Sequence, residues 1–221
     1  MSVSKDIQTQ IAALMAHGNI PGRVQSVCLC ATSGNNRTYR VATTHGLLAA
    51  KHYFQHDGDS RDRLGTEFGF STYAAKSAAG MAPAPLAIDH SRGIGLYEFI
   101  DGDPILASTV NWDRVQNAAN FFLALNLSVS RAQAKALPDA SEACFSILEH
   151  LDRVSGRLCA LSAQVPDTAE NAGAHKLIRE ISAYWVKLSA NVLTSVQSVG
   201  ISANLCLSAD QRCVSPSDFG F

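Results

Sequence analysis

The sequence predicts a two-lobe α+β fold, in which a small antiparallel β lobe precedes a larger helical lobe. Residues 22–100 contain short segments in which apolar and polar residues alternate, which is the period of a β-strand. Residues 108–198 instead carry apolar residues at spacings of three and four, which is the period of a helix. A polar break at 101–104 contains Gly and Pro and is interpreted as a hinge. We therefore expect a first lobe over 1–100 and a second over 105–221.

The first lobe is expected to start with a helix and continue as a β-meander with short turns. Ile7, Ile11 and Leu14 lie on one side of the starting helix. Polar turn residues follow each predicted strand, and Pro83 and Pro85 prevent the second helix from continuing. The expected elements are a helix within 1–20, strands over 24–30, 39–44 and 47–54, a helix over 61–79, and strands over 86–88 and 94–99.

The second lobe is expected to consist of amphipathic helices. Apolar residues recur at helical spacing over 112–122, over 144–158 and over 178–196. Asp167 and Glu170 stand three positions apart before the last of these segments, so they are predicted to form its N-terminal capping box.

The composition excludes several classes of protein. The 221 residues include 18 basic and 19 acidic side chains, a balance that gives no electrostatic footprint for nucleic acid. No stretch approaches the roughly 20 apolar residues of a membrane span, and the first residues lack the pattern of a signal peptide. The six cysteines form no C-x-x-C and no zinc spacing with histidine. We expect a cytoplasmic protein with no membrane contact, no metal ligands within the chain, and reduced, mostly buried thiols.

Two charged residues stand in an order that suits phosphate chemistry. Lys51 interrupts the apolar strand over 47–54, and Glu67 lies on the next predicted helix. Each alone is compatible with an ordinary surface residue, because long charged side chains usually reach water. Together they match the lysine and glutamate with which kinase folds hold the phosphates of a nucleotide.

Two turns complete the candidate set. The turn between the first two strands contains Gly34, Asn35 and Asn36, whose backbone N–H groups could cover phosphates. It lacks a full G-x-G-x-x-G, so an ordinary hairpin turn is equally compatible, and the chain contains no P-loop. Near the end of the sequence, Ser-Pro-Ser places Asp218 in a turn that could present a carboxylate at the mouth of a cleft.

The order of these features resembles the aminoglycoside phosphotransferase and choline kinase family. The features are a V-A-x-K-like strand at Lys51, a helical Glu67, the hinge sequence Y-E-F-I-D-G, a helical lobe and a terminal S-P-S-D-F-G-F, and they span about residues 24–221. The resemblance implies a protein-kinase-like fold with an enlarged helical lobe. It also implies transfer of the γ-phosphate of ATP or GTP to a hydroxyl of a small molecule, whose identity the sequence leaves open.

The resemblance assigns roles to particular residues. Lys51 would bind the α- and β-phosphates, and Glu67 would hold Lys51. The backbone of Glu98, Phe99 and Ile100 would contact the purine. Asp218 begins an Asp-Phe-Gly, but a metal-binding motif of that kind needs a catalytic aspartate roughly 15–20 residues earlier, and residues 195–205 contain none. Asp218 is therefore assigned to the catalytic loop, where it would orient the acceptor hydroxyl and accept its proton.

The magnesium ligands are expected beyond the end of this sequence. In the kinase signature the metal-binding asparagine follows the catalytic aspartate by about five positions, which here lies past Phe221. We therefore expect the chain to be cut off within the catalytic loop, to be inactive at this length, and to self-associate through uncovered apolar surface. Two alternatives remain: a non-catalytic pseudokinase-like domain for nucleotide binding or interaction, and a structural helical protein with a β cap.

Overall fold

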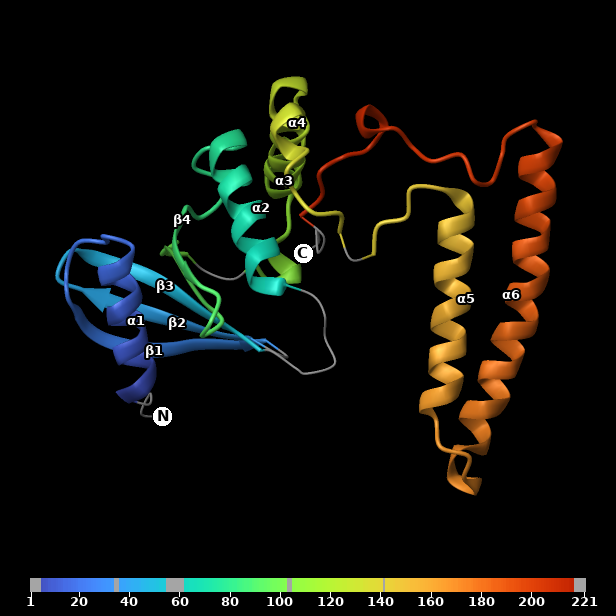
Figure 1. Ribbon diagram of the computed structural model, residues 1–221, viewed down its shortest axis with the longest axis horizontal. Helices are drawn as coiled ribbons and strands as arrows, with labels where there is room; N and C mark the ends of the chain where they lie inside the picture. The colour runs from blue at the N-terminus through green and yellow to red at the C-terminus, as the bar shows by residue number, and fades with distance from the viewer. Residues whose placement is uncertain (1–4, 34–35, 55–61, 103–104, 141, 217–221) are drawn as a thin grey trace. The chain divides into compact units, whose positions relative to one another are not determined.

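The computed structural model describes residues 5–33, 36–54, 62–102, 105–140 and 142–216 (Figure 1). Within these ranges the chain forms five β-strands and six α-helices, and the α+β class predicted from the sequence is confirmed. The chain divides into two compact units. The first comprises the residues up to Ala140 together with those from Cys213 onward, and the second comprises Ser141–Arg212.

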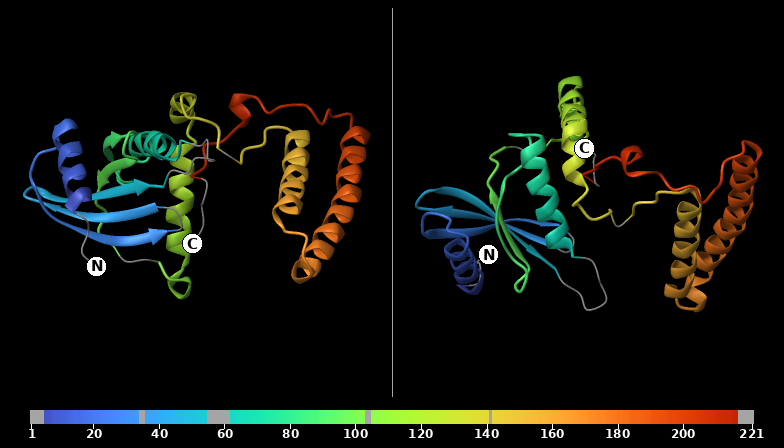
Figure 2. Two further views of the ribbon diagram at one scale, coloured as in Figure 1. Left: turned by 60° about the horizontal axis from the view of Figure 1, so that its bottom comes forward. Right: turned by 45° about the horizontal axis from the view of Figure 1, so that its top comes forward.

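The first unit is built on one antiparallel sheet, whose strands are visible in Figure 2. The spatial order is β1-β2-β3-β5-β4, and every neighbouring pair is antiparallel. Both the meander and the two short strands expected from the sequence are present. Their bounds are β1 Val24–Ser33, β2 Asn36–Thr43, β3 Gly46–Tyr53, β4 Pro85–Asp89 and β5 Ile94–Glu98.

Helix α1 (Lys5–His17) covers one face of this sheet. Its apolar side buries Ile7, Ile11, Leu14 and Met15, as the spacing predicted. These side chains form one core with inward-facing strand residues Tyr39, Val41, Ala50, Ala87, Ile94 and Leu96. Because side chains alternate along a strand, the neighbours of these core residues project toward the opposite face.

Helix α2 (Arg63–Ser77) lies against that opposite face and continues the packing toward the helices α3 (Trp112–Leu125) and α4 (Ser128–Ala134). Tyr73 and Ala74 of α2 and Ala78, which caps its C-terminus, form a second core with Leu125 of α3. The compact unit extends past 101–104, because Leu125 of α3 is buried against α2 and the partly buried Phe121, Ala124 and Ala134 pack around this core.

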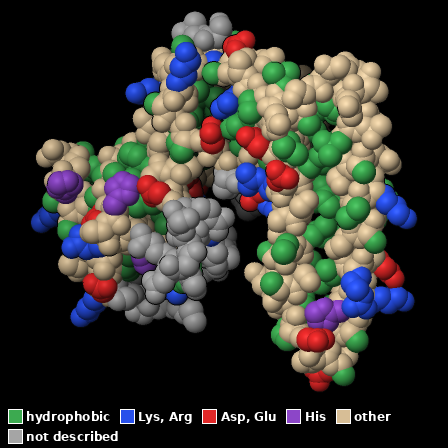
Figure 3. Space-filling model, turned by 45° about the vertical axis from the view of Figure 1, so that its right-hand side comes forward, with side chains coloured by type: hydrophobic (Ala, Val, Ile, Leu, Met, Phe, Trp, Pro, Cys, Tyr) green, Lys and Arg blue, Asp and Glu red, His purple; other side chains and the backbone are tan. Residues whose placement is uncertain are grey.

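The second unit contains two long helices, α5 (Ile147–Gln164) and α6 (Ala172–Ser198), that pack along each other. Trp185 of α6 donates its indole N–H to the hydroxyl of Ser155 on α5 at 2.9 Å. Many large apolar side chains of the pair remain exposed, and Figure 3 shows hydrophobic side chains gathered over both helices. The remaining short elements of the chain are the 3₁₀ turns Ala107–Thr109, Ala169–Asn171 and Ala209–Gln211.

The second unit contains capping boxes at Ser146–Glu149 and at Ser208–Gln211, both away from the predicted place. Ser146 caps α5, its hydroxyl accepting a bond from the Glu149 N–H at 3.1 Å while the Glu149 carboxylate accepts one from the Ser146 N–H at 3.2 Å. The prediction of a box at Asp167 and Glu170 is wrong. A 3₁₀ turn occupies that stretch, and α6 begins after Asn171 with no side-chain cap.

The cysteines also depart from expectation. All six are free thiols, and five of them are exposed, so the prediction of mostly buried thiols is wrong. Cys28, one of the exposed five, lies on the edge strand β1 opposite Arg40 of β2, so its side chain projects to the face away from the core under α1. No helix of the described residues is long and apolar enough to cross a membrane.

Asn126, at the end of α3, binds the chain segment that returns from the second unit. Its side-chain N–H₂ donates to the carbonyls of Val214 and Phe122, both at 2.9 Å, and its oxygen accepts from the Val214 N–H at 2.8 Å. The same turn of α3 accepts a hydrogen bond at the Leu125 carbonyl from the Tyr73 hydroxyl. These hydrogen bonds join α2, α3 and the segment at Val214 around the second core.

Replacing Asn126 by alanine is expected to lower the free energy of unfolding by about 1–3 kcal/mol, because both backbone groups of the partly buried Val214 lose their partner. Urea denaturation of the two proteins measures the difference. The control is Asn120→Ala on the same helix, whose amide oxygen accepts a hydrogen bond from the exposed Gln116 side chain. Equal effects of the two substitutions would contradict the prediction.

Candidate functional site

Lys51 and Glu67 form the centre of the candidate site. The Lys51 ammonium on β3 lies 2.7 Å from both carboxylate oxygens of Glu67 on α2. The side chains are 24% and 39% exposed, so the ion pair is partly buried while the ammonium remains reachable from solvent. A bidentate carboxylate leaves a lysine with further donor capacity, which an anionic ligand can use.

Strand register places Lys51 on the face of the sheet that meets α2. Its neighbour Ala50 is fully buried in the core under α1, so Lys51 projects the other way. Across the strands it stands opposite Thr38 of β2 and Gly95 of β5. On α2, the Asp62 carboxylate accepts from the Gly65 N–H at 2.8 Å and caps the helix five residues before Glu67.

Two tyrosines lie beside this ion pair. Tyr53, two residues after Lys51, shares a hydrogen bond of 2.9 Å between its hydroxyl and that of Tyr97 on β5. Only 3% and 5% of these two residues are exposed. The Lys51 ammonium lies 5.0 Å from the centre of the Tyr53 ring, a cation–π distance.

The Tyr97 ring lies over Gly95, and this position depends on the missing side chain. A Cβ at Gly95 would stand 2.8 Å from atoms of that ring, closer than real contacts allow. The ring of Phe68 on α2 packs against the Tyr97 ring with centroids 5.9 Å apart and planes tilted by 56°. Gly95 and Phe68 together direct the Tyr97 hydroxyl toward Tyr53.

The surroundings keep both phenols protonated. Burial raises the pKa of Tyr97 to about 12, the Glu67 charge acts in the same direction, and the hydrogen bond with Tyr53 opposes them. The pKa of Tyr53 is raised further, by burial first, then by Tyr97, and then by the nearby Glu67 carboxylate. At neutral pH the two tyrosines are therefore neutral donors next to the carboxylate.

The segment after β5 leaves the end of an inner strand, which lies between β3 and β4. The Glu98 N–H donates to the Ala84 carbonyl at 2.8 Å, and the Glu98 carboxylate accepts from the Ala84 N–H at 3.3 Å. Within the described residues, the backbone of Phe99 and Ile100 makes no hydrogen bond. The Arg40 guanidinium of β2 lies 5.7 Å from the centre of the Phe99 ring.

The structure brings part of the predicted set together. Asn36 pairs with Tyr53 across β2 and β3, and its side-chain oxygen accepts from the Phe54 N–H at 3.3 Å, so it lies at the Lys51 end of the sheet. Glu98 pairs with Leu48 on the same β3. Gly34, Asn35 and Asp218 lie outside the described residues.

Sequence reasoning missed three residues of this region: Tyr53, Tyr97 and Arg40. Tyr53 could have been found from the alternation of side chains along a strand, because it stands two positions after Lys51 and so lies on the same face of the sheet. Tyr97 and Arg40 belong to other strands, and their place beside Lys51 or Phe99 depends on the register of the sheet.

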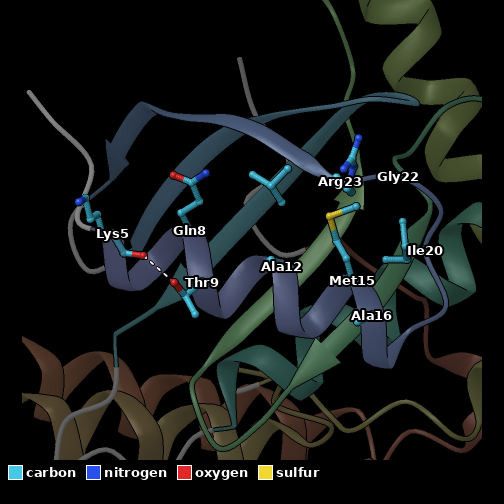
Figure 4. Close-up of a pocket in the computed structure, with 10 residues that line it drawn as sticks. Lys5, Gln8, Thr9, Ala12, Met15, Ala16, Ile20, Gly22 and Arg23 are labelled. Atoms are coloured by element: carbon cyan, nitrogen blue, oxygen red, sulfur yellow. Dashed lines mark hydrogen bonds between the residues drawn. The ribbon is translucent and has the colours of Figure 1, made fainter.

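Two further features lie outside this set. Within the described ranges, no group of three or more His, Cys, Asp or Glu side chains could hold a metal ion. An open groove of about 670 Å³ runs between α1 and the start of β1, on the α1 side of the sheet (Figure 4). It contains none of the predicted site residues and is lined by Lys5, Gln8, Thr9, Ala12, Met15, Ala16, Ile20, Gly22, Arg23 and Val24.

Comparison with solved structures identifies the fold. A protein from Ralstonia eutropha described as an aminoglycoside phosphotransferase matches 71% of this chain at 16% sequence identity, with a TM-score of 0.50. The chain shares the fold of that structure over the matched part, which confirms the fold class expected from the sequence. No protein-family model and no curated protein sequence matches the chain.

Two other solved structures were also matched. A choline kinase from Cryptosporidium parvum covers 79% of this chain at 15% identity, with a TM-score of 0.46. A protein from Thermobifida fusca described as a fructosamine-3-kinase covers 55% at 19% identity, with a TM-score of 0.38. The chain spans about half the length of these three structures, between 40% and 49% of each.

The raised pKa of the tyrosines predicts a loss of stability in alkali. An unfolded tyrosine ionises near pH 10, whereas folded Tyr97 holds its proton to about pH 12. Stability is therefore complete below about pH 10 and falls by about 1.4 kcal/mol per pH unit for each such tyrosine as the pH rises toward 12. Tyr97→Phe removes one titrating group, so the decline should become shallower.

Urea denaturation at several pH values between about 9 and 12 measures this decline. Tyr184→Phe on α6 makes the same chemical change at an exposed tyrosine and serves as the control. The prediction would be contradicted if the free energy of unfolding of Tyr97→Phe fell with pH as steeply as that of the control and of the unsubstituted protein.

Proposed function

We propose that this chain provides the nucleotide-binding part of a phosphotransferase that moves the γ-phosphate of ATP or GTP to a hydroxyl of a small molecule. The observation that carries the proposal is the bidentate pair of Lys51 on the third strand with Glu67 on the following helix. The shared fold with a protein described as an aminoglycoside phosphotransferase supports it.

The ion pair suits binding of nucleotide phosphates. A triphosphate needs a fixed cation at its α- and β-phosphates, and a carboxylate that holds the lysine fixes that cation. Lys51 is partly exposed and can bind phosphate oxygens while Glu67 holds it from the α2 side. Asn36, at the start of β2 and the same end of the sheet, would bring the β1–β2 turn over the phosphates.

The segment after β5 is suited to bind the purine base of the nucleotide. Purines bind well where backbone donors and acceptors are available beside an apolar surface. Phe99 and Ile100 make no backbone hydrogen bonds within the described residues, and Glu98 leads into them from the strand beside Lys51. In this proposal Asp218 orients the acceptor hydroxyl and accepts its proton, and magnesium accompanies the nucleotide.

Replacing Lys51 by methionine is expected to weaken binding of ATP or GTP by about tenfold to a hundredfold, because charge-assisted hydrogen bonds to the phosphates are lost. Isothermal titration calorimetry of residues 1–221 with each nucleotide, with and without Mg²⁺, measures the affinity. Methionine keeps most of the apolar stem of Lys51, so the sheet should remain folded.

Lys76→Met is the matched control, because Lys76 is an exposed lysine in the last turn of the helix that carries Glu67. It should leave the affinity unchanged. Nucleotide binding that survives Lys51→Met unchanged would remove the basis of the proposal.

A further inference from the structure

We propose that Tyr97 and Tyr53 act as positioning residues for the ion pair, holding the Glu67 carboxylate through a chain of hydroxyl hydrogen bonds so that Glu67 keeps Lys51 in place. The consequence for nucleotide affinity rests on the function proposed above, whereas the positioning itself does not.

The ion pair needs such support because it is open to water. The Glu67 side chain is 39% exposed and that of Lys51 is 24% exposed. Pairs of this kind constrain their geometry weakly, since water competes for both charges and two long side chains must give up rotamer freedom. A lysine that has to meet a phosphate at a defined place therefore benefits from a carboxylate that is itself held.

The tyrosine pair stands where it can hold that carboxylate. Tyr53 shares the face of β3 with Lys51, and its ring lies 5.0 Å from the ammonium. Its hydroxyl bonds that of Tyr97 at 2.9 Å in a buried setting, where water does not compete. The Tyr97 ring touches Phe68, which follows Glu67 directly on α2, so Tyr97 contacts the same helical turn.

The direction of the hydrogen bonds follows from the chemistry of the groups. An ionised carboxylate only accepts, whereas a phenol donates one hydrogen and also accepts. The structure holds the Tyr53–Tyr97 bond and the bonds from Lys51 to Glu67. The proposal adds the step between them, in which Tyr53 donates to Glu67 while its oxygen accepts from Tyr97. The raised pKa of both tyrosines keeps the two donors protonated at neutral pH.

Packing alone is the competing explanation, and a double-mutant cycle separates the two. Tyr97→Phe removes one oxygen and keeps the ring that packs on Phe68, and Glu67→Ala removes the acceptor at a partly exposed position. If Tyr97 acts through Glu67, the two substitutions are not additive. If Tyr97 only fills space, its substitution has the same effect with and without Glu67.

The first arm of the experiment needs no ligand. The unfolding equilibrium constants of the four proteins, wild type, Y97F, E67A and the double variant, are measured by urea denaturation. We expect Y97F to raise this constant when Glu67 is present. In the E67A background, the factor by which Y97F raises it should be at least about threefold smaller. Tyr39→Phe, a buried tyrosine in the core under α1, is the control and should show no coupling to E67A.

The second arm measures ATP affinity for the same proteins by calorimetry. Y97F is expected to weaken binding by about threefold to tenfold when Glu67 is present, and by less than about twofold in E67A. Additive effects in the ligand-free arm overturn the proposal whether or not ATP binds. Unchanged affinity in Y97F, in a protein that binds ATP, overturns its functional half. Absence of ATP binding in the wild type would overturn the proposed function and leave the first arm to decide the positioning role.

Discussion

The ion pair between Lys51 and Glu67 is the interaction around which the first unit is arranged. It joins β3 to α2 across 16 positions of sequence, and it requires α2 to lie on the face of the sheet to which Lys51 projects. Gly95 is small enough to let the Tyr97 ring lie over it on that face, and Phe68 packs on the ring from the helix. The cap at Asp62 starts α2 where Glu67 can reach the lysine.

The sheet separates packing from chemistry by the alternation of its strands. On β3, Ala50 is buried against α1 while the adjacent Lys51 meets α2 and solvent. The α1 face therefore supplies a dry apolar core, and the opposite face carries the charges, the tyrosine pair and the Arg40–Phe99 contact. A rigid core behind a polar face keeps functional groups at defined positions, because the strands that carry them are held from the other side.

Local patterns predicted the elements well, but they carry little information on how the helices pack together. The periods of two and of three to four residues are set by burial on one face, so the strands and the long helices were visible in the sequence. Helix α4, Ser128–Ala134, spans only about two turns and gives too little periodicity to detect. The predicted box at Asp167 and Glu170 was wrong because two residues three positions apart can also lie in a 3₁₀ turn. The packing of α3 and α4 on α2 joins segments far apart in the sequence and has no local pattern.

The sequence by itself determined which residues could carry phosphate chemistry and in what order they occur: Lys51 in an apolar strand, then Glu67 on the next helix. The alternation of side chains along this strand also places Tyr53 on the same face of the sheet as Lys51. Only the tertiary structure decided that Tyr53 bonds Tyr97, 44 positions away, and that Asn126 bonds Val214, 88 positions away. Such bonds depend on the register between strands and on the packing of helices, which are set by the burial of many side chains at once and leave no signal in a local stretch of sequence.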